Sequence, residues 1–135
     1  MSESIQKIET KQAPQALGPY SQAISVNITN SRLLFISGQL PLNPATGKLV
    51  DGGIEEATKQ VFDNLEAILM AGNSSLSQVV RVEVFLKDLN DFQKMNEEYK
   101  KRFTNANFPA RQTVQVARLP LDASLEISCI AVVNQ

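Results

Sequence analysis

Hydrophobic residues follow two different periods along the chain, and each change of period predicts a new element. Alternating apolar and polar residues, or short apolar runs, indicate strands. Six strands are expected, at 5–9, 20–26, 32–37, 79–87, 110–117 and 125–133. The segment Pro41 to Gly53 contains two prolines and three glycines and is predicted as a loop.

Two segments instead show the three- and four-residue repeat of amphipathic helices. The first repeat is Ile54, Ala57, Val61, Leu65 and Ile68, and Gly72 is predicted to end this helix. The second repeat is Leu89, Phe92, Met95, Tyr99 and Phe103, which favours a core stripe over a ligand site. Charged residues four apart are expected on its outer side as the pairs Glu97/Lys101 and Glu98/Arg102.

The order β-β-β-α-β-α-β-β predicts one α+β domain over residues 1–135, a six-stranded mixed sheet with two helices packed on one face. Several strands are nevertheless apolar on both faces. In the strand 79–87, Val80, Val82, Val84 and Leu86 are assigned to one face. In the last strand, Ile130 and Val132 point away from the face that carries Leu125 and Ile127. A second subunit is the simplest cover for the other face, which predicts a homo-oligomer.

Charge and composition then narrow the classes of function. The chain has 135 residues, of which 43% are hydrophobic, and its 13 basic and 14 acidic residues give a net charge of −1. A protein that neutralises nucleic-acid phosphates usually has a basic excess, so no nucleic acid is expected as partner. No apolar run approaches the roughly 20 residues of a membrane span, and the start lacks a signal-peptide core. We expect a cytoplasmic protein.

The chain has no histidine and one cysteine, Cys129. These counts argue against imidazole bases, Ser-His-Asp and Cys-His systems, disulfides and Cys/His metal sites. Phosphate-binding glycine motifs are also missing, so neither a metal nor a cofactor is predicted. Cys129 itself is interpreted as a small buried hydrophobic residue.

Two charged residues in strands are the main candidates for chemistry. Alternation places Arg111 and Thr113 on one face of their strand, and we assign Val114 and its neighbour Val116 to the helix-covered core. Arg111 would then lie on the face expected for subunit contact. It could form an interfacial salt bridge or bind a carboxylate through its planar guanidinium. Glu126, inside an apolar strand, could pair with a partner subunit or act as a general acid/base.

Weaker candidates lie at turns. Tyr20 follows Gly18-Pro19 and is either a packing residue or a hydroxyl at a pocket rim. Ser37-Gly38 at a strand end is either a plain turn or a place where backbone N–H groups meet a ligand.

Around these candidates the sequence resembles the RidA/YjgF family, over nearly the whole chain and in the family's order. The segments that carry the resemblance are Gly18-Pro19-Tyr20-Ser21-Gln22-Ala23, Ser37-Gly38-Gln39, Val84-Phe85-Leu86-Lys87-Asp88-Leu89, Phe108-Pro109-Ala110-Arg111, Val116-Ala117-Arg118-Leu119-Pro120 and Leu125-Glu126-Ile127. Each segment alone is a weak signal, but together they are specific.

The resemblance implies a chorismate-mutase-like fold and a homotrimer with clefts between subunits. It also implies a cofactor-free enzyme that hydrolyses 2-imino or enamino acids, such as 2-iminobutanoate and 2-iminopropanoate, to 2-keto acids and ammonia. Such intermediates are released by pyridoxal-phosphate enzymes such as threonine dehydratase, as in isoleucine biosynthesis.

By position in the family's motifs, Arg111 would hold the substrate carboxylate and Glu126 would activate water. The other positions that match the family's substrate cleft are Tyr20, Ser37, Gly38 and Asn96. This chain has Thr113 where many members have cysteine, and Gln112 is bulkier than the usual residue, so Thr113 is expected at the substrate with an altered pocket.

Two other functions stay open from sequence. One is a non-catalytic module that binds a carboxylate ligand through Arg111. The other is an endoribonuclease, a role proposed for some relatives, against which the acidic composition argues. Glu126 favours the enzyme over the receptor, because a receptor for an anion has no need of a carboxylate beside it.

Overall fold

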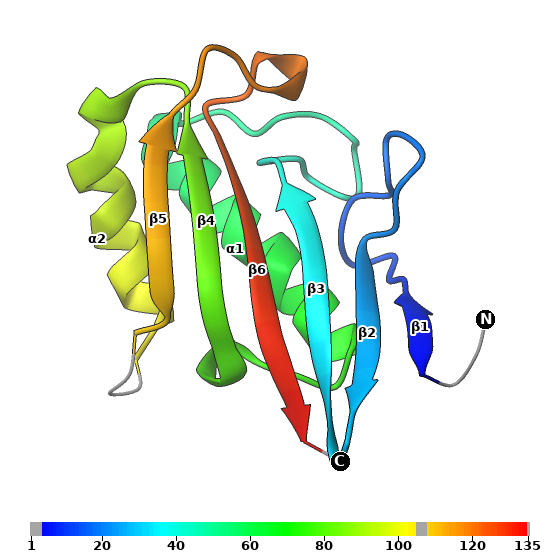
Figure 1. Ribbon diagram of the computed structural model, residues 1–135. Helices are drawn as coiled ribbons and strands as arrows, with labels where there is room; N and C mark the ends of the chain where they lie inside the picture. Colours follow the sequence, from blue (N-terminus) through cyan, green and yellow to red (C-terminus); the bar gives the residue numbers. More distant parts are fainter. Residues whose placement is uncertain (1–3, 105–107, 135) are drawn as a thin grey trace.

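The computed structural model describes residues 4–104 and 108–134, and in it two helices lie behind one face of a sheet (Figure 1). The strands are β1 (Ile5–Ile8), β2 (Ala23–Ile28), β3 (Ser31–Gln39), β4 (Val79–Leu86), β5 (Ala110–Gln115) and β6 (Leu125–Asn134). The helices are α1 (Gly53–Ala71) and α2 (Phe92–Arg102), and short 3-10 turns lie at Leu76–Gln78, Leu89–Asp91 and Pro120–Asp122. The predicted strands and helices are all confirmed, with shifted ends.

The sheet has six strands in the order β1-β2-β3-β6-β4-β5, and it is mixed as predicted. Strands β4 and β5 pair in parallel, whereas the other neighbours pair antiparallel. A parallel pair needs a crossover connection, and α2 supplies it between β4 and β5. The strand order also places the last strand, β6, inside the sheet between β3 and β4.

The hydrophobic core fills the space between the helices and the sheet. The predicted apolar stripe of α1 is buried in it, and alternate residues of β6 meet it from the other side. Of the second predicted stripe, Met95, Tyr99 and Phe103 are buried and Phe92 is partly buried, whereas Leu89 is exposed in the 3-10 turn before α2. Helix α1 ends at Ala71 and is capped by Gly72, as predicted. A Cβ on Gly72 would lie 2.7 Å from Leu34 Cδ2 of β3, so the close approach to the sheet requires a glycine. The left-handed residue after the helix is Asn73, with φ of 61°.

Two details of the sequence prediction are wrong. Val80 is exposed while Val79 is buried, because a bulge at Val79/Arg81 inserts one residue opposite β6. The expected pairs of charges four apart on α2 also do not form. Glu98 is instead buried between the helices, 2.7 Å from Lys101 Nζ.

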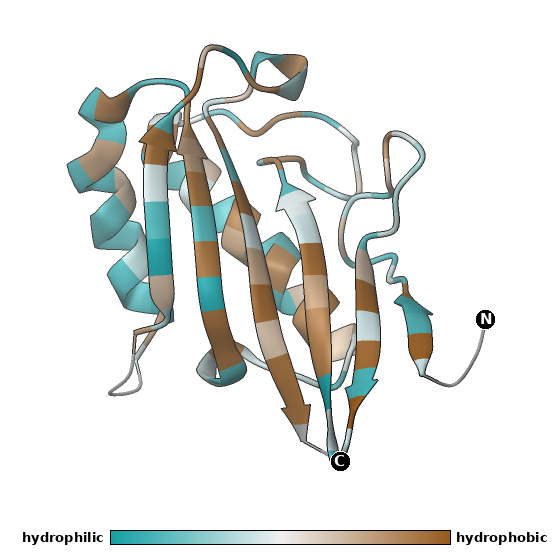
Figure 2. Cartoon of the chain, in the orientation of Figure 1, coloured by the Kyte–Doolittle hydropathy of each residue, from teal (hydrophilic) through white to brown (hydrophobic). Residues whose placement is uncertain are grey.

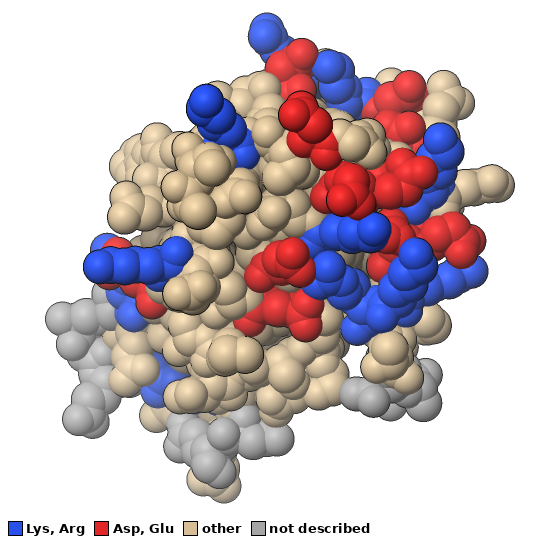
Figure 3. All heavy atoms as spheres, turned by 180° about the vertical axis from the view of Figure 1, so that it is seen from behind, with Lys and Arg blue, Asp and Glu red and all other residues tan. Residues whose placement is uncertain are grey.

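Arg102 crosses to α1, with Nη2 2.9 Å from Asp63 Oδ1. These contacts belong to a mixed field of acidic and basic side chains on the helical side of the molecule (Figure 3). Acidic and basic side chains are interspersed there, and neither sign dominates.

The face of the sheet away from the helices is largely apolar, and we call it the open face. At one end Phe85 packs against the loop residues Leu40, Leu42, Leu119 and Ala123, and no described helix covers the rest. Figure 2 shows the apolar bands that run along the strands. The apolar residues on the open face include Ile24, Val26, Leu33, Phe35, Phe85, Val114, Ile130 and Val132. The prediction of strands that are apolar on both faces is therefore confirmed.

Candidate functional site

A cleft of about 470 Å³ opens near the end of β3 and the start of β6. We call it the Glu126 cleft. It is lined by Leu17, Gly18, Pro19, Tyr20, Ser37, Gly38, Leu40, Pro120 and Glu126. Four residues predicted at the site, Tyr20, Ser37, Gly38 and Glu126, thus come together in one cleft. Apolar walls with one carboxylate are suited to a small, partly apolar ligand.

A bulge in β3 brings Gly38 and Glu126 together. Ile36 pairs with Cys129 and Gln39 with Ile127, so Ser37 and Gly38 both lie opposite Ser128, two residues from Glu126 on β6. A Cβ on Gly38 would lie 2.7 Å from Glu126 Cδ. The glycine therefore leaves the space that the Glu126 side chain occupies.

Glu126 is half-buried, and none of the described residues hydrogen-bonds or ion-pairs with its carboxylate. Burial raises the pKa of this carboxyl above its usual range. A carboxylate in this setting can exchange a proton with a ligand or a water molecule. The missing cation argues against a purely structural role for Glu126.

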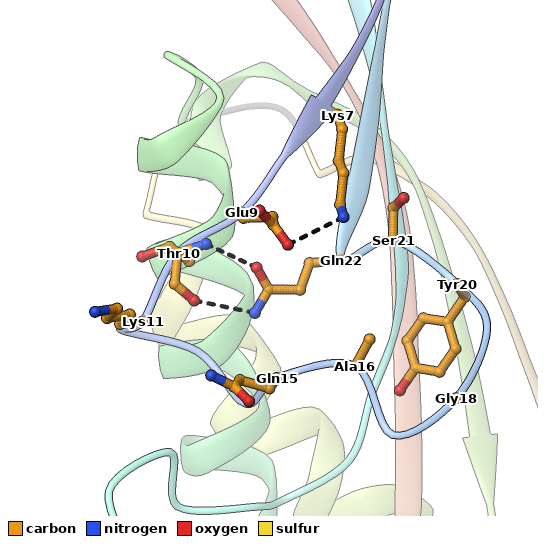
Figure 4. A pocket seen from close by; sticks show the side chains of 10 residues that line it. All are labelled: Lys7, Glu9, Thr10, Lys11, Gln15, Ala16, Gly18, Tyr20, Ser21 and Gln22. Atoms are coloured by element: carbon orange, nitrogen blue, oxygen red, sulfur yellow. Dashed lines mark hydrogen bonds and ion pairs between the residues drawn. The ribbon is translucent and has the colours of Figure 1, made fainter. Parts of the chain in front are cut away.

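The wall that carries Tyr20 is held by Gln22, which sequence reasoning did not single out. Its buried side chain accepts a hydrogen bond from Thr10 N at 2.7 Å (Figure 4). It also donates to Pro14 O at 2.7 Å. The hydroxyl of Tyr20 accepts a hydrogen bond from Leu17 N at 3.0 Å. The loop that forms this side of the cleft is therefore folded onto β2 rather than free.

Ser37 is tied to the same region. Its hydroxyl donates to Ser21 O at 2.6 Å, and its N–H donates to Gln22 O at 2.9 Å. Both groups of Ser37 are thus already used within the chain, and the residue shapes the cleft.

A larger cavity of about 580 Å³ lies on the other side of the Tyr20 loop (Figure 4). Its lining is mostly polar, and its buried amide, Gln22, is already bound to the backbone. Lys7 at its rim is paired with Glu9 at 3.1 Å. Apart from Tyr20, the residues predicted at the site do not line it, so we place no chemistry there.

Arg111 lies in a second pocket of about 280 Å³, which we call the Arg111 pocket. Its lining residues are Asn96, Tyr99, Lys100, Phe108, Pro109 and Arg111. Arg111 Nη1 donates to Asn96 Oδ1 at 2.7 Å, and the guanidinium lies over the Tyr99 ring at 4.6 Å. Among the described residues no carboxylate pairs with Arg111, and its one hydrogen bond to a side chain there is the bond to Asn96.

The face that we assigned to Arg111 from the sequence is wrong. Arg111 pairs with Val82 in the parallel register, and Val82 is buried beneath the helices. Arg111 therefore points to the helical side, and Val114, which pairs with Phe85, points to the open face. The error arises because β5 is an edge strand. It lies beyond the centre of the core, and on the helical side its arginine is covered by α2 only.

The neighbours of Arg111 divide between the two faces. Thr113 shares the helical side, and its buried Oγ1 has no hydrogen-bond partner among the described residues. Gln112 points to the open face, where its Oε1 accepts from Arg81 Nη2 at 3.4 Å. Gln112 thus does not reach the Arg111 pocket of its own chain.

Cys129 is buried in the core, as predicted, and burial raises the pKa of its thiol to about 12. The described residues contain no group of three or more His, Cys, Asp or Glu that could hold a metal ion. In the same part of the chain, no helix is long and apolar enough to cross a membrane.

The sequence is similar to a known protein family and to several named proteins. A family model described as Endoribonuclease L-PSP matches residues 10–133. A RutC family protein of Pyrococcus abyssi is 49% identical over 92% of this chain and 94% of the relative. A human protein named 2-iminobutanoate/2-iminopropanoate deaminase is 45% identical over 93% of this chain and 88% of the relative.

Solved structures agree with the fold. RidA from a Psychrobacter species superposes with a TM-score of 0.84 at 42% identity and covers 93% of this chain and 98% of its own. Escherichia coli TdcF with bound serine has a TM-score of 0.85 at 41% identity, over 94% of this chain and 98% of its own.

Proposed function

The chain belongs to the Rid family, whose model carries the L-PSP description, and from that premise we propose that it hydrolyses 2-imino and enamino acids to 2-keto acids and ammonia. Relatives that are named for this activity support the proposal. So does a relative with bound serine, because serine carries the same α-carboxylate as the proposed substrates.

The observation that carries the proposal is a pair of opposite charges, one in each pocket, for which the described residues offer no ion-pair partner. Arg111 binds Asn96 with one donor and meets no carboxylate among these residues, which suits a bidentate contact with a substrate carboxylate. Glu126 is half-buried and meets no cation in the same part of the chain, which suits a base for water. The two pockets lie on opposite faces of the sheet, so one chain cannot offer both groups to a single small acid.

We therefore place the complete site between subunits, with the Glu126 cleft of one protomer facing the Arg111 pocket of its partner. The largely apolar open face supports such an assembly, and we propose the homotrimer expected from the family. Tyr20 and Gly38 would line one half, and Asn96 and Thr113 the other. The buried, unpaired hydroxyl of Thr113 is suited to a ligand contact in that half.

The reaction needs only orientation and one proton acceptor. Water adds to the imine carbon while Glu126 accepts its proton, which forms a C–O bond and moves the C=N π electrons to nitrogen. Glu126 returns this proton to the nitrogen, which gives a carbinolamine. The hydroxyl proton of the carbinolamine then passes through Glu126 to the same nitrogen as the C=O bond forms and the C–N bond breaks, so that ammonia and the 2-keto acid leave. Since the imine carbon is already electrophilic, positioning and general base catalysis of about 10²- to 10⁴-fold are sufficient.

The alternative of a carboxylate receptor without catalysis differs in one respect. It gives no role to Glu126, whereas the proposed hydrolysis requires it. The acidic net charge continues to argue against an endoribonuclease, and we propose a cytoplasmic enzyme.

The test is keto-acid release from 2-iminobutanoate generated in situ, with the protein first dialysed against a chelator. Wild type should accelerate release over buffer. Arg111→Ala should lose about 2–4 kcal/mol of transition-state stabilisation, and Arg111→Lys should not restore it fully.

Glu126→Gln should keep binding of a 2-keto acid but lose turnover. No acceleration by assembled wild-type protein would show that the proposed reaction is wrong. Full activity in both folded variants would show that the proposed site is wrong.

A further inference from the structure

The guanidinium of Arg111 is held by one side of α2 rather than by an acidic residue. Tyr99 lies beneath it at 4.6 Å, Phe92 lies at 5.6 Å, and Asn96 accepts one hydrogen bond. These three residues are spaced four and three apart, so they share one face of the helix. The sequence stripe that we assigned to the core thus also faces the arginine.

This arrangement solves a specific problem for a carboxylate-binding arginine. A carboxylate partner within the chain would compete with the ligand, whereas an aromatic face attracts the cation and leaves its edge donors free. A ring beneath the guanidinium also fixes its plane, which a bidentate contact requires.

We propose that the ring of Tyr99 is a positioning residue for Arg111, which it holds in the plane that grips the substrate carboxylate. This inference rests on the proposed function only for the identity of the ligand. The cation–aromatic contact is a property of the chain itself.

The ring, and not the hydroxyl, is the part that acts. Tyr99 Oη is buried and has no hydrogen-bond partner among the described residues. The buried ring is fixed from behind by Phe62, edge-on at 5.6 Å, and by Phe103 at 4.7 Å. A platform clamped between two other rings cannot turn away from Arg111.

The experiment measures the affinity for 2-oxobutanoate by calorimetry beside imine turnover. Tyr99→Leu should weaken 2-oxobutanoate binding about tenfold and raise KM more than it lowers kcat, since the grip on the carboxylate serves ground and transition states alike. Tyr99→Phe keeps the ring and should bind within about twofold of wild type, with an unchanged or higher melting temperature.

Leu34→Ala is the control for lost core packing. Leu34 is fully buried on β3 against the end of α1 at Gly72, outside the aromatic cluster that contains Tyr99. It should lower the melting temperature at least as much as Tyr99→Leu while leaving the affinity for 2-oxobutanoate unchanged. If Tyr99→Leu does not fold, Phe92→Leu replaces it, with an expected loss of about threefold because its ring is farther away.

Unchanged affinity in the folded Tyr99→Leu or, failing that, in Phe92→Leu would overturn the proposal. An equal loss of affinity in Leu34→Ala, or a full loss in Tyr99→Phe, would do the same. Failure of the proposed reaction has a separate signature: wild type would bind 2-oxobutanoate but release no keto acid from the imine.

Discussion

Arg111 and Glu126 project from opposite faces of the same sheet. Arg111 on β5 pairs with Val82 of β4, and Glu126 on β6 pairs with Phe85 of β4. Their strands are separated by β4, which places the two backbones roughly 10 Å apart even before the side chains diverge. The two charges can serve one small substrate only if they come from different subunits.

Complementation between variants tests this relationship directly. Arg111→Ala and Glu126→Gln should each be nearly inactive as pure proteins. When they are unfolded together and refolded at equal ratio, Arg111 of one variant meets Glu126 of the other at some interfaces. Random mixing in a cyclic oligomer restores the intact pair at about a quarter of the sites, so about a quarter of wild-type turnover should return. Mixed oligomers of confirmed composition that stay inactive would contradict a shared site.

Gly38→Ala should damage the site without removing a functional group. The added methyl would meet the Glu126 side chain, with Cδ at 2.7 Å, and the carboxylate must move. We expect turnover to fall about 10- to 100-fold, with a loss of about 1–3 kcal/mol in the free energy of unfolding.

Gly47→Ala is the control for that change. Gly47 has φ of +72° in the loop before α1 and nothing within 4 Å of an added Cβ. It should cost about 1 kcal/mol in unfolding free energy and leave turnover unchanged. Equal kinetics for the two alanine variants would show that the space over Gly38 is unimportant.

The pH dependence should report the raised pKa of Glu126. As a base it acts when ionised, so kcat/KM should fall with decreasing pH at a midpoint above 4.5, its ordinary value. Folding disfavours the ionised form, so the stability penalty is absent below the ordinary pKa and complete above the raised one. Glu126→Gln should therefore lose this acid limb and be at least as stable as wild type at neutral pH. An acid limb at or below pH 4.5 would contradict the assignment.

The open face should be required for assembly. Phe35 lies on the open face, where its side chain is 42% exposed and pairs with Ile130 of β6. Phe35→Glu should lower the oligomer mass measured by light scattering and abolish turnover, with the secondary structure retained.

Met70 provides the comparison, because it is 75% exposed on α1. Met70→Glu removes an exposed apolar side chain of similar size from the helical side and should not change the mass. A wild-type protein that stays at 14.9 kDa at micromolar concentration would sink both the interface and the shared site.

The sequence alone was enough for the elements and for much of one half of the site. Periodicity identified β2, β3, α1, β4, α2 and β6 because each buries a stripe of apolar residues, and that stripe is a local property. Strand β5 buries no such stripe and was identified from its alternating pattern alone. Alternation likewise placed Glu126 opposite Leu125 and Ile127, since β6 is central and its core side is unambiguous. The quoted motifs also contained Tyr20, Ser37 and Gly38, which line the Glu126 cleft.

Only the tertiary structure decided which face carries Arg111. Strand β5 has a polar and an apolar side, and at an edge the apolar side need not face the helices, because the open face is apolar as well. The parallel register with β4 put Arg111 beneath α2, where Tyr99 and Asn96 hold it. Neither that register nor the bulge that sets Gly38 against Glu126 follows from local periodicity, because both depend on strands far apart in the chain.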